Sequence, residues 1–383
     1  MSVLIWGSAL STPELRHEVP APIYDPLLYL EHGDQRVVIV SPLDASRLQA
    51  SGGLEVLTFE DFGFEKLMSE GRPRNQALAA VMVAACARYR VTAVKVPERF
   101  PLWTARALEM AQISVMVDRE LFDMRRRRKS ALELEGIRRA STAADAALAA
   151  ISERLARADT AGTTLTVEGV AVTCEGLKRL ADDVLRDHGC AFDQGIIAHG
   201  DQGARGHDMG SGPIAAGETV IVDLWPRDVA TGTYTDVTRT FVVGEIPEEI
   251  ASWHRLCLDA LNETLASVRP GASTRDLHHA VSDLFARNGF ETATARRTDG
   301  PQVDGFFHNL GHGVGLEVHE SPLLDRWSDE VLVEGDVVAV EPGLYRSAYG
   351  GCRLEDTVLV TSDGSEALTV FPYDLTPRST TSG

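Results

Sequence analysis

The strongest constraint on this chain comes from carboxylates that interrupt strand-like, apolar sequence in its second half. Four segments place an aspartate or a glutamate inside or at the end of a hydrophobic run: 219–224 (TVIVDL), 234–241 (YTDVTRTF), 337–343 (VVAVEPG) and 353–360 (RLEDTVLV). A single carboxylate of this kind is usually a turn residue. Four brought together would repel one another and raise each other's pKa until some lost their charge. We therefore expect a cation to offset them.

Two kinds of cation are available. Arg239 and Arg353 lie in the same segments and would make a structural ion-pair network. The histidines favour a divalent metal instead, because residues 306–320 (FFHNLGHGVGLEVHE) hold three of the eleven histidines, together with three glycines that let backbone approach a ligand closely. Carboxylates with one imidazole suit hard or borderline divalent ions. Two such ions balance four carboxylates, and paired ions activate a bridging water as the nucleophile of a hydrolase.

The chain is long enough for two domains. From residue 36 to 117, short β-branched runs alternate with helical patterns, which predicts an α/β domain with a largely parallel sheet. The composition then changes at five consecutive basic residues, 125–129 (RRRRK). We interpret this run as a solvated connection that pairs with carboxylates elsewhere, rather than as a patch for an anion or a partner. The predicted domains are therefore residues 1–124 and 125–383.

The second domain has the pattern of an internal duplication. Two helical patterns precede a β-rich stretch, and the same order then returns: helices at 131–158 and 166–186 with strands from 196 to 243, then helices at 247–268 and 273–288 with β-like segments up to 370. Two helix–helix–sheet halves imply a pseudo-symmetric fold with a cleft between them. The carboxylate-bearing segments fall in the sheet portions of both halves.

Charge and cysteine usage exclude several classes of function. The chain has 37 basic and 56 acidic residues, so its formal charge of −19 repels nucleic acid and anionic lipid. No apolar run approaches the roughly 20 residues of a membrane span, and no basic residues precede the short apolar run near the N-terminus. The five cysteines are scattered, without a Cys-x-x-Cys pair, which argues against a disulfide framework or a thiolate metal site. We expect a soluble, cytoplasmic protein.

These motifs resemble the metallopeptidases of the "pita-bread" fold, in the branch of aminopeptidase P and prolidase. The resemblance is weak in the N-terminal domain and strong from about residue 195 to 363. It implies an α/β N-terminal domain, followed by an α+β pita-bread catalytic domain with a pseudo-twofold internal duplication. It also implies a dinuclear metal site with five ligands: Asp223, Asp236, His312, Glu341 and Glu355.

The resemblance implies roles for these ligands. Asp236 and Glu355 would bridge the two ions, and Glu341 would also accept and return a proton of the bridging water. Manganese is the first choice of metal, with cobalt or zinc as alternatives, because the ligand types do not discriminate sharply among them. The family further implies a homodimer.

The resemblance also implies roles for three more histidines and one arginine. His207, His308 and His319 match catalytic histidines, which would stabilise the oxyanion that develops on the scissile carbonyl. His207 follows Gly206, where a proline often stands. His308 and Arg353 are also expected to bind substrate, Arg353 near its carboxylate end. The alternative for Arg353 is a structural ion pair with a carboxylate of its own segment, at position 355 or 356.

One departure from the family pattern bears on specificity. Thirteen positions separate Asp223 from Asp236, about two more than is common, and residues 225–228 (WPRD) stand where a glycine often follows the first aspartate. A hairpin with a longer turn at 230–233 would absorb the insertion and keep both carboxylates on one face. That turn is then a candidate to line the cleft.

The predicted function is hydrolysis of the N-terminal Xaa-Pro bond of short peptides, by an Xaa-Pro aminopeptidase or dipeptidase with a bridging hydroxide as nucleophile. The amide before proline has no N–H, so proteases that need a hydrogen-bonded strand handle it poorly. Methionine aminopeptidases generally lack the preceding α/β domain, and creatinases lack the full metal set. Two alternatives remain: a hydrolase of the same fold for a small non-peptide C–N bond, and a catalytically silent binding protein.

Overall fold

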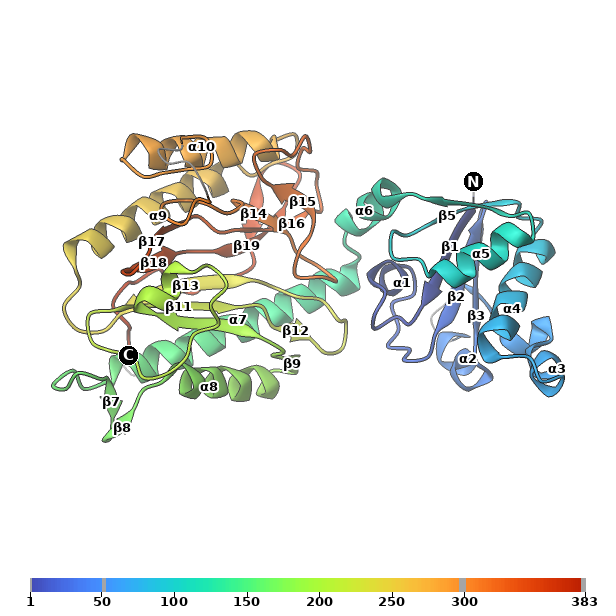
Figure 1. Ribbon diagram of the computed structural model, residues 1–383, viewed down its shortest axis with the longest axis horizontal. Helices are drawn as coiled ribbons and strands as arrows, with labels where there is room; N and C mark the ends of the chain where they lie inside the picture. The colour runs from blue at the N-terminus through green and yellow to red at the C-terminus, as the bar shows by residue number, and fades with distance from the viewer. Residues whose placement is uncertain (1, 50–52, 296–300, 380–383) are drawn as a thin grey trace. The chain divides into compact units, whose positions relative to one another are not determined.

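The computed structural model describes residues 2–49, 53–295 and 301–379 of the chain. The chain divides into two compact units, Met1–Arg126 and Arg127–Gly383, and helix α6 (Arg119–Arg127) contains the boundary (Figure 1). Each unit has hydrophobic clusters of its own. Within the described ranges, every helix is too short or too polar to cross a membrane.

The N-terminal unit is built on one six-stranded sheet with helices on both faces. Its strands follow the order β4-β3-β2-β1-β5-β6: β1 (Ser2–Gly7), β2 (Leu27–His32), β3 (Gln35–Val40), β4 (Glu55–Thr58), β5 (Ala93–Val96) and β6 (Ser114–Val117). Side chains alternate along a strand. Leu4 therefore packs in the cluster that contains α3 (Phe64–Ser69), α4 (Arg74–Arg88) and α5 (Leu102–Met110). Ile5 packs on the other face with α1 (Pro13–Glu18), α2 (Pro42–Gln49) and α6.

This sheet is mixed, whereas the sequence predicts a largely parallel one. The pairs β1–β5, β5–β6 and β3–β4 are parallel, and the pairs β1–β2 and β2–β3 are antiparallel. The difference comes from β1 and β2, two apolar runs that the sequence prediction leaves unassigned. β2 and β3 form a tight hairpin in which Gly33 takes a left-handed conformation (φ 60°), the backbone state that glycine adopts without strain.

The C-terminal unit repeats the predicted order of two helix–helix–sheet halves. In the first, α7 (Ala131–Ala156) and α8 (Cys174–Asp187) pack on the sheet β10-β11-β13: β10 (Gly195–His199), β11 (Thr219–Leu224) and β13 (Val237–Val242). In the second, α9 (Glu248–Ser267) and α10 (Thr274–Arg287) pack on the sheet β15-β14-β16-β19-β20: β14 (Gly311–Gly313), β15 (Glu320–Leu324), β16 (Val337–Val340), β19 (Asp356–Val360) and β20 (Ser365–Ala367). The hairpin β17 (Gly343–Arg346) and β18 (Gly350–Arg353) joins the second core.

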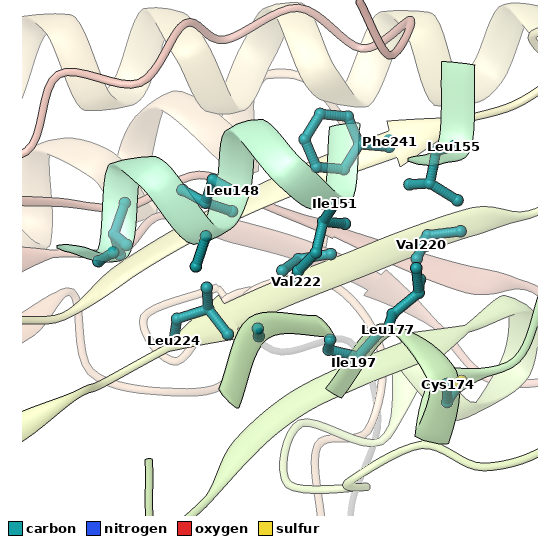
Figure 2. Packing of buried hydrophobic residues seen from close by; sticks show 14 of the residues in the cluster. Leu148, Ile151, Leu155, Cys174, Leu177, Ile197, Val220, Val222, Leu224 and Phe241 are labelled. Atoms are coloured by element: carbon teal, nitrogen blue, oxygen red, sulfur yellow. The ribbon is translucent and has the colours of Figure 1, made fainter. Parts of the chain in front are cut away.

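Core packing decides which face of β11 carries the carboxylate. Leu148 and Ile151 of α7 belong to the same buried cluster as Val220 and Val222 of β11 (Figure 2). Burying side chains of this size stabilises the fold by roughly 1.5–3 kcal/mol each. Because the side chains of a strand alternate, Asp223 points to the opposite side of the sheet from Val222 and the helices.

One predicted helix starts later than expected. The sequence predicts a helix over 166–186, but residues Thr166–Val167 (β7) and Val170–Ala171 (β8) form a hairpin, and α8 begins only at Cys174. Glu168 and Gly169 both have positive φ (54° and 77°), which is the backbone of a two-residue hairpin turn. The helix then starts where the hydroxyl of Thr173 accepts the N–H of Gly176.

The basic run at 125–129 pairs with carboxylates as predicted, but most of it is buried rather than solvated. Arg126, Arg127 and Lys129 are only 5%, 4% and 9% exposed. The guanidinium of Arg127 forms two hydrogen bonds with the buried carboxylate of Asp336, at 2.8 and 2.7 Å, and Lys129 pairs with Glu320. Arginine and lysine are rarely buried unless they are paired, so these distant carboxylates account for the burial of Arg127 and Lys129.

Candidate metal centre and active site

All nine residues that the sequence predicts for the site line one cavity of about 890 Å³ in the C-terminal unit. The five candidate ligands come from both halves of the duplication. Asp223 lies in β11 and Asp236 directly before β13, whereas His312 lies in β14, Glu341 directly after β16 and Glu355 directly before β19. The five candidate ligands thus come from positions up to 132 apart in the sequence, between Asp223 and Glu355.

The two sheets meet at the ligands. Thr238 of β13 and Glu355 form an antiparallel bridge, in which the N–H of Glu355 donates to the carbonyl of Thr238 at 3.1 Å. The hydroxyl of Thr238 donates to Oε2 of Glu355 at 2.7 Å. Thr357 contacts the backbone of Asp236: its hydroxyl accepts the N–H of Asp236 at 3.1 Å and donates to its carbonyl at 2.7 Å. Asp236 and Glu355 are therefore held by a direct junction between the halves.

The two glycines that flank His312 allow its strand to pack closely in the sheet. A Cβ at Gly311 would lie 2.0 Å from the carbonyl oxygen of Ala339, and one at Gly313 would lie 2.4 Å from that of Ser321. Only glycine allows neighbouring strands to come so close. The close packing of the strands therefore accounts for Gly311 and Gly313, and the expectation that these glycines let backbone approach a ligand stays a prediction. They place β14 between β15 and β16, with His312 at its centre.

The ligand atoms fall into groups that would each fit one ion. Asp223, Asp236 and Glu355 offer oxygen atoms within 4.8 Å of one another, and so do His312, Glu341 and Glu355 with one nitrogen and two oxygens. Glu355 is common to both groups. Nε2 of His312 lies 3.8 Å from Oδ2 of Asp236 and 3.8 Å from Oε1 of Glu341. One carboxylate shared by two neighbouring groups is the arrangement of a bridging ligand.

The electrostatics of these groups call for a cation. Burial, reinforced by the surrounding carboxylates, raises the pKa of Asp236 and of Glu355 well above the ordinary range. Burial also raises the pKa of Glu341 to about 8, against the opposing effect of Arg353. Burial lowers the pKa of His312 to about 3, so its imidazole is neutral and can bind a metal. Among the described residues, Oδ1 of Asp236 is a buried oxygen without a hydrogen-bond partner, which fits a metal ligand.

The arginines offset only part of this charge. Arg353 donates to Oδ2 of Asp223 and, at 2.8 Å, to the hydroxyl of Tyr345. The alternative considered for Arg353, an ion pair with position 355 or 356, is therefore wrong, because its side chain turns toward β11. Arg239 pairs with Asp356 instead. With all four carboxylates ionised, the single guanidinium of Arg353 leaves the cluster with about three unbalanced negative charges, which divalent ions would neutralise.

His308 is tied to residues that the sequence prediction does not name. Its Nε2 lies 3.0 Å from the hydroxyl of Tyr345, and its Nδ1 lies 2.7 Å from the carbonyl of Asn309. Burial lowers the pKa of His308 to about 3, so the ring is neutral. Since a carbonyl only accepts, Nδ1–H donates to Asn309 and Nε2 accepts from Tyr345. Both nitrogens are thus used within the protein, and His308 has no N–H left to donate to a substrate in this conformation.

His207 and His319 face the cavity in a different way. Both side chains are exposed and line its wall. The ring of His319 stands edge-on to that of His312, with 4.2 Å between the ring centroids. His319 also forms a third potential metal-binding group, with Asp236 and His312. These two imidazoles are therefore open to a substrate.

The 225–228 insertion contributes Trp225 to the cavity, but the turn itself lies elsewhere. Trp225 lines the cavity wall, whereas residues 228–233 do not. The carboxylate of Asp228 accepts two hydrogen bonds from Arg139 of α7, both at 3.0 Å, and also the N–H of Thr231 at 2.8 Å. Thr231 lies directly against Gly136, where a Cβ would come within 2.0 Å of its hydroxyl. The turn is therefore packed on α7, and the expectation that it lines the cleft is wrong.

We expect Asp236→Asn to stabilise the metal-free protein. A carboxyl whose pKa is higher in the folded protein than in the unfolded chain holds more protons when folded, so its contribution to stability falls as the pH rises from about 4 toward that raised value. Removing the charge should raise the free energy of unfolding at pH 8 by at least about 1 kcal/mol, since a tenfold change in proton affinity corresponds to about 1.4 kcal/mol. Urea unfolding with a chelator present measures the change, which should shrink at pH 5. A less stable variant at pH 8 would contradict it.

The family follows from comparison with known proteins. Residues 135–362 match the model of metallopeptidase family M24. This chain belongs to that family. The M24 chain is 35% identical over 186 residues to an Xaa-Pro dipeptidase of Pyrococcus furiosus, which is 48% of this chain and 49% of the relative. It is 29% identical over 248 residues to the probable dipeptidase PepE of Mycobacterium tuberculosis, 64% and 60% of the two chains. The chain thus matches about half of the first relative and three fifths of the second.

Solved structures extend the likeness in fold to nearly the full length of this M24 chain. The prolidase from Pyrococcus furiosus superposes with a TM-score of 0.75, covering 96% of each chain at 23% sequence identity. The X-Pro aminopeptidase from Thermotoga maritima also gives 0.75, covering 98% of this chain and 97% of the other at 20% identity. The fold predicted from the motifs, an α/β domain followed by a pita-bread domain, is therefore confirmed. Family M24 implies divalent metal ions, and the ligand groups described above fit them.

Proposed function

We propose that this M24 chain hydrolyses the first peptide bond of short peptides with proline in second position, as an Xaa-Pro dipeptidase or aminopeptidase. The observation that carries the proposal is the convergence of four carboxylates and a neutral imidazole, to which Arg353 contributes one balancing guanidinium. The name of the Pyrococcus furiosus relative, Xaa-Pro dipeptidase, supports this choice of substrate. The homodimer and the cytoplasmic location expected from the sequence remain predictions.

Two divalent ions would be held by Asp223, Asp236, His312, Glu341 and Glu355. Four oxygen donors and one imidazole suit manganese first, and also cobalt or zinc. When bound, the ions would supply Lewis-acid polarisation of the scissile carbonyl and activation of water for attack. The protein contributes a rigid set of ligands, because Asp236 and Glu355 are anchored to opposite sides of the sheet junction.

Glu341 is the residue we assign to proton transfer. Its carboxylate lies on the cavity wall, with Oε2 3.8 Å from Nδ1 of His308 and 4.0 Å from Nε of Arg353. As the C–N bond to proline breaks, the proline nitrogen needs a proton to leave as an amine. Glu341 would take a proton from the attacking water and deliver it to that nitrogen.

The substrate would be oriented by the remaining residues of the cavity. His207 and His319 are open to it and would donate hydrogen bonds to the oxyanion. His308 would shape the wall of the cavity, because hydrogen bonds with Tyr345 and Asn309 hold its ring in place. Because Arg353 is already bound to Asp223 and Tyr345, its main effect would be to orient Asp223.

Peptide cleavage with and without metal tests the proposal. We expect the manganese-loaded protein to release alanine from Ala-Pro, from Ala-Pro-Ala, or from both, and Ala-Ala to be cleaved far more slowly. A chelator should abolish the activity, and added manganese should restore it. If the protein binds two manganese ions and cleaves neither proline peptide, the proposal fails. Turnover of small non-peptide amides would then favour a different hydrolase, and inertness toward them a binding protein.

A further inference from the structure

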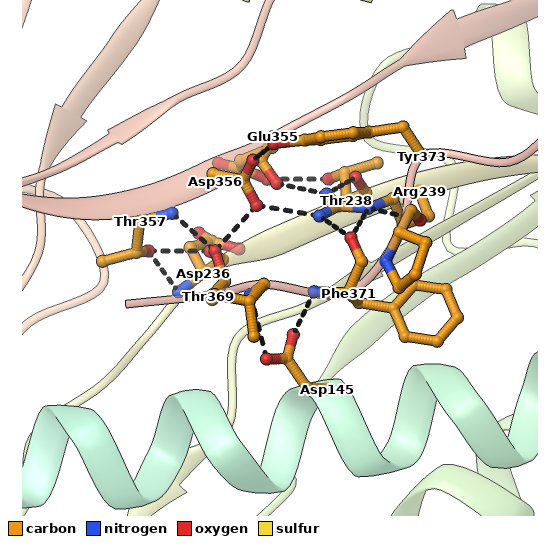
Figure 3. Close-up of polar contacts among 12 residues, drawn as sticks. Asp145, Asp236, Thr238, Arg239, Glu355, Asp356, Thr357, Thr369, Phe371 and Tyr373 are labelled. Carbon is orange, nitrogen blue, oxygen red and sulfur yellow. Dashed lines mark hydrogen bonds and ion pairs between the residues drawn. The ribbon is translucent and has the colours of Figure 1, made fainter. Parts of the chain in front are cut away.

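The side of the metal ligands that faces away from the cavity holds a buried polar network centred on Arg239 (Figure 3). Arg239 is 1% exposed and is the largest of the fully buried side chains. Its guanidinium carbon lies 4.4 Å from the centre of the Tyr373 ring. The guanidinium donates to five acceptors: the carbonyls of Thr238, Glu355, Phe371 and Pro372, and the carboxylate of Asp356.

The network joins the two strands that carry Asp236 and Glu355. Nη1 of Arg239 donates to the carbonyl of Thr238 at 2.9 Å and to that of Glu355 at 2.7 Å, so one nitrogen holds both strands. Thr238 and Thr357 then reach the ligands directly, as described above. A shift of Arg239 would therefore reach the carboxylate of Glu355 through Thr238, and the backbone of Asp236 through the strand that carries Thr357.

The network also includes the segment 369–373, which follows the last strand of the sheet. The carboxylate of Asp356 accepts hydrogen bonds from Arg239 at 2.8 Å, from the hydroxyl of Thr369 at 2.8 Å, and from the hydroxyl of Tyr373. The segment is held to α7 by Asp145, which accepts the N–H groups of residues 370 and 371 at 3.0 and 3.1 Å. Segment 369–373, which contains none of the metal ligands, thus supports the junction between the two sheets.

We propose that Arg239 is a positioning residue of the metal centre, which together with Asp356 and Tyr373 sets the separation of Asp236 and Glu355. The inference rests on the two-ion site of the proposed function. A planar guanidinium with five fixed donors can satisfy acceptors on two strands and on segment 369–373 at once. Lysine would keep the charge but lose this geometry. Residues around a metal site that orient its ligands typically change metal affinity or activity 10- to 100-fold when replaced.

The test compares Arg239→Lys and Tyr373→Phe with the unaltered full-length protein. Manganese is titrated into the metal-free proteins by calorimetry, and the magnetic coupling between paired manganese ions is followed by electron paramagnetic resonance. We expect Arg239→Lys to weaken manganese binding at least tenfold, or to reduce it to one ion. Tyr373→Phe should act in the same direction with a smaller effect. With Ala-Pro, kcat should fall while KM changes little.

The control is Ile151→Ala, which removes a buried side chain of α7 that lies outside the network. It should lower the thermal stability but leave manganese affinity and pairing unchanged. If both Arg239→Lys and Tyr373→Phe bind two ions with unaltered affinity and coupling, the inference is wrong. If the unaltered protein itself does not bind two ions, the proposed function fails first. Should Arg239→Lys not fold, Tyr373→Phe decides alone.

Discussion

Glu341→Gln is expected to abolish peptide cleavage, with kcat for Ala-Pro reduced by at least about 10³-fold, toward the upper part of the range for loss of a general acid–base. Glutamine has nearly the same shape but cannot take a proton from water, and its amide is a poorer metal ligand than a carboxylate. Steady-state kinetics at saturating manganese measure the loss. Because Glu341 would serve both as ligand and as proton carrier, manganese titration of the same variant separates the two effects.

Glu334→Gln provides the matched control, since Glu334 is an exposed glutamate a few residues earlier in the chain. It should leave kcat and manganese binding unchanged. Full activity in Glu341→Gln would remove this residue from proton transfer. If Glu341→Gln loses activity but still binds two ions, the loss belongs to the proton step rather than to metal binding.

Arg127→Met is expected to lower the free energy of unfolding by about 3–5 kcal/mol. The reason is the carboxylate that loses its partner: Asp336 is 0% exposed and accepts two hydrogen bonds from the guanidinium of Arg127. An unpaired carboxylate buried at this depth is among the most destabilising defects in a protein core. Denaturant unfolding of the metal-free protein measures the change in the transition that involves the C-terminal unit.

Two further variants make this prediction specific. Arg127→Met combined with Asp336→Asn should recover much of the loss. The buried charge is removed, and the amide oxygen at position 336 can still accept the hydrogen bond from the N–H of Val333. Arg138→Ala breaks an ion pair with Glu366 whose side chains are 45% and 46% exposed, and should change stability by less than about 1 kcal/mol. Equal losses for the buried and the exposed pair would show that burial is not what matters here.

Much of the candidate site could be predicted from local sequence. Alternation along 219–224 places Asp223 opposite Val222, and an aspartate inside such a strand needs a partner whatever the rest of the fold does. The same reasoning singles out the carboxylates near 236, 341 and 355. The histidines at 308, 312 and 319 stand close enough together to indicate a site by their spacing alone.

Contacts between distant segments could not be predicted in the same way. Arg353 pairs with Asp223, 130 positions away, rather than with its neighbours, because strand register decides which way its side chain turns. Tyr345 was missed for the same reason, since nothing in its local sequence shows that it bonds both His308 and Arg353. The hairpin of β2 and β3 was missed although Gly33 marks its turn, because the apolar run before it carries no alternation.

The sequence by itself determined the kind of chemistry: which side chains are acidic, that they lie in strands with the apolar pattern of buried ones, and that a cluster of histidines accompanies them and favours a metal. Only the tertiary structure decided how that charge is arranged. It assigned one arginine to Asp223 and another to the network behind the ligands, and it buried the basic run against carboxylates such as Asp336, some 209 positions away. The physical reason is that composition sets which charges exist, whereas strand register and packing set the distances on which their interaction depends.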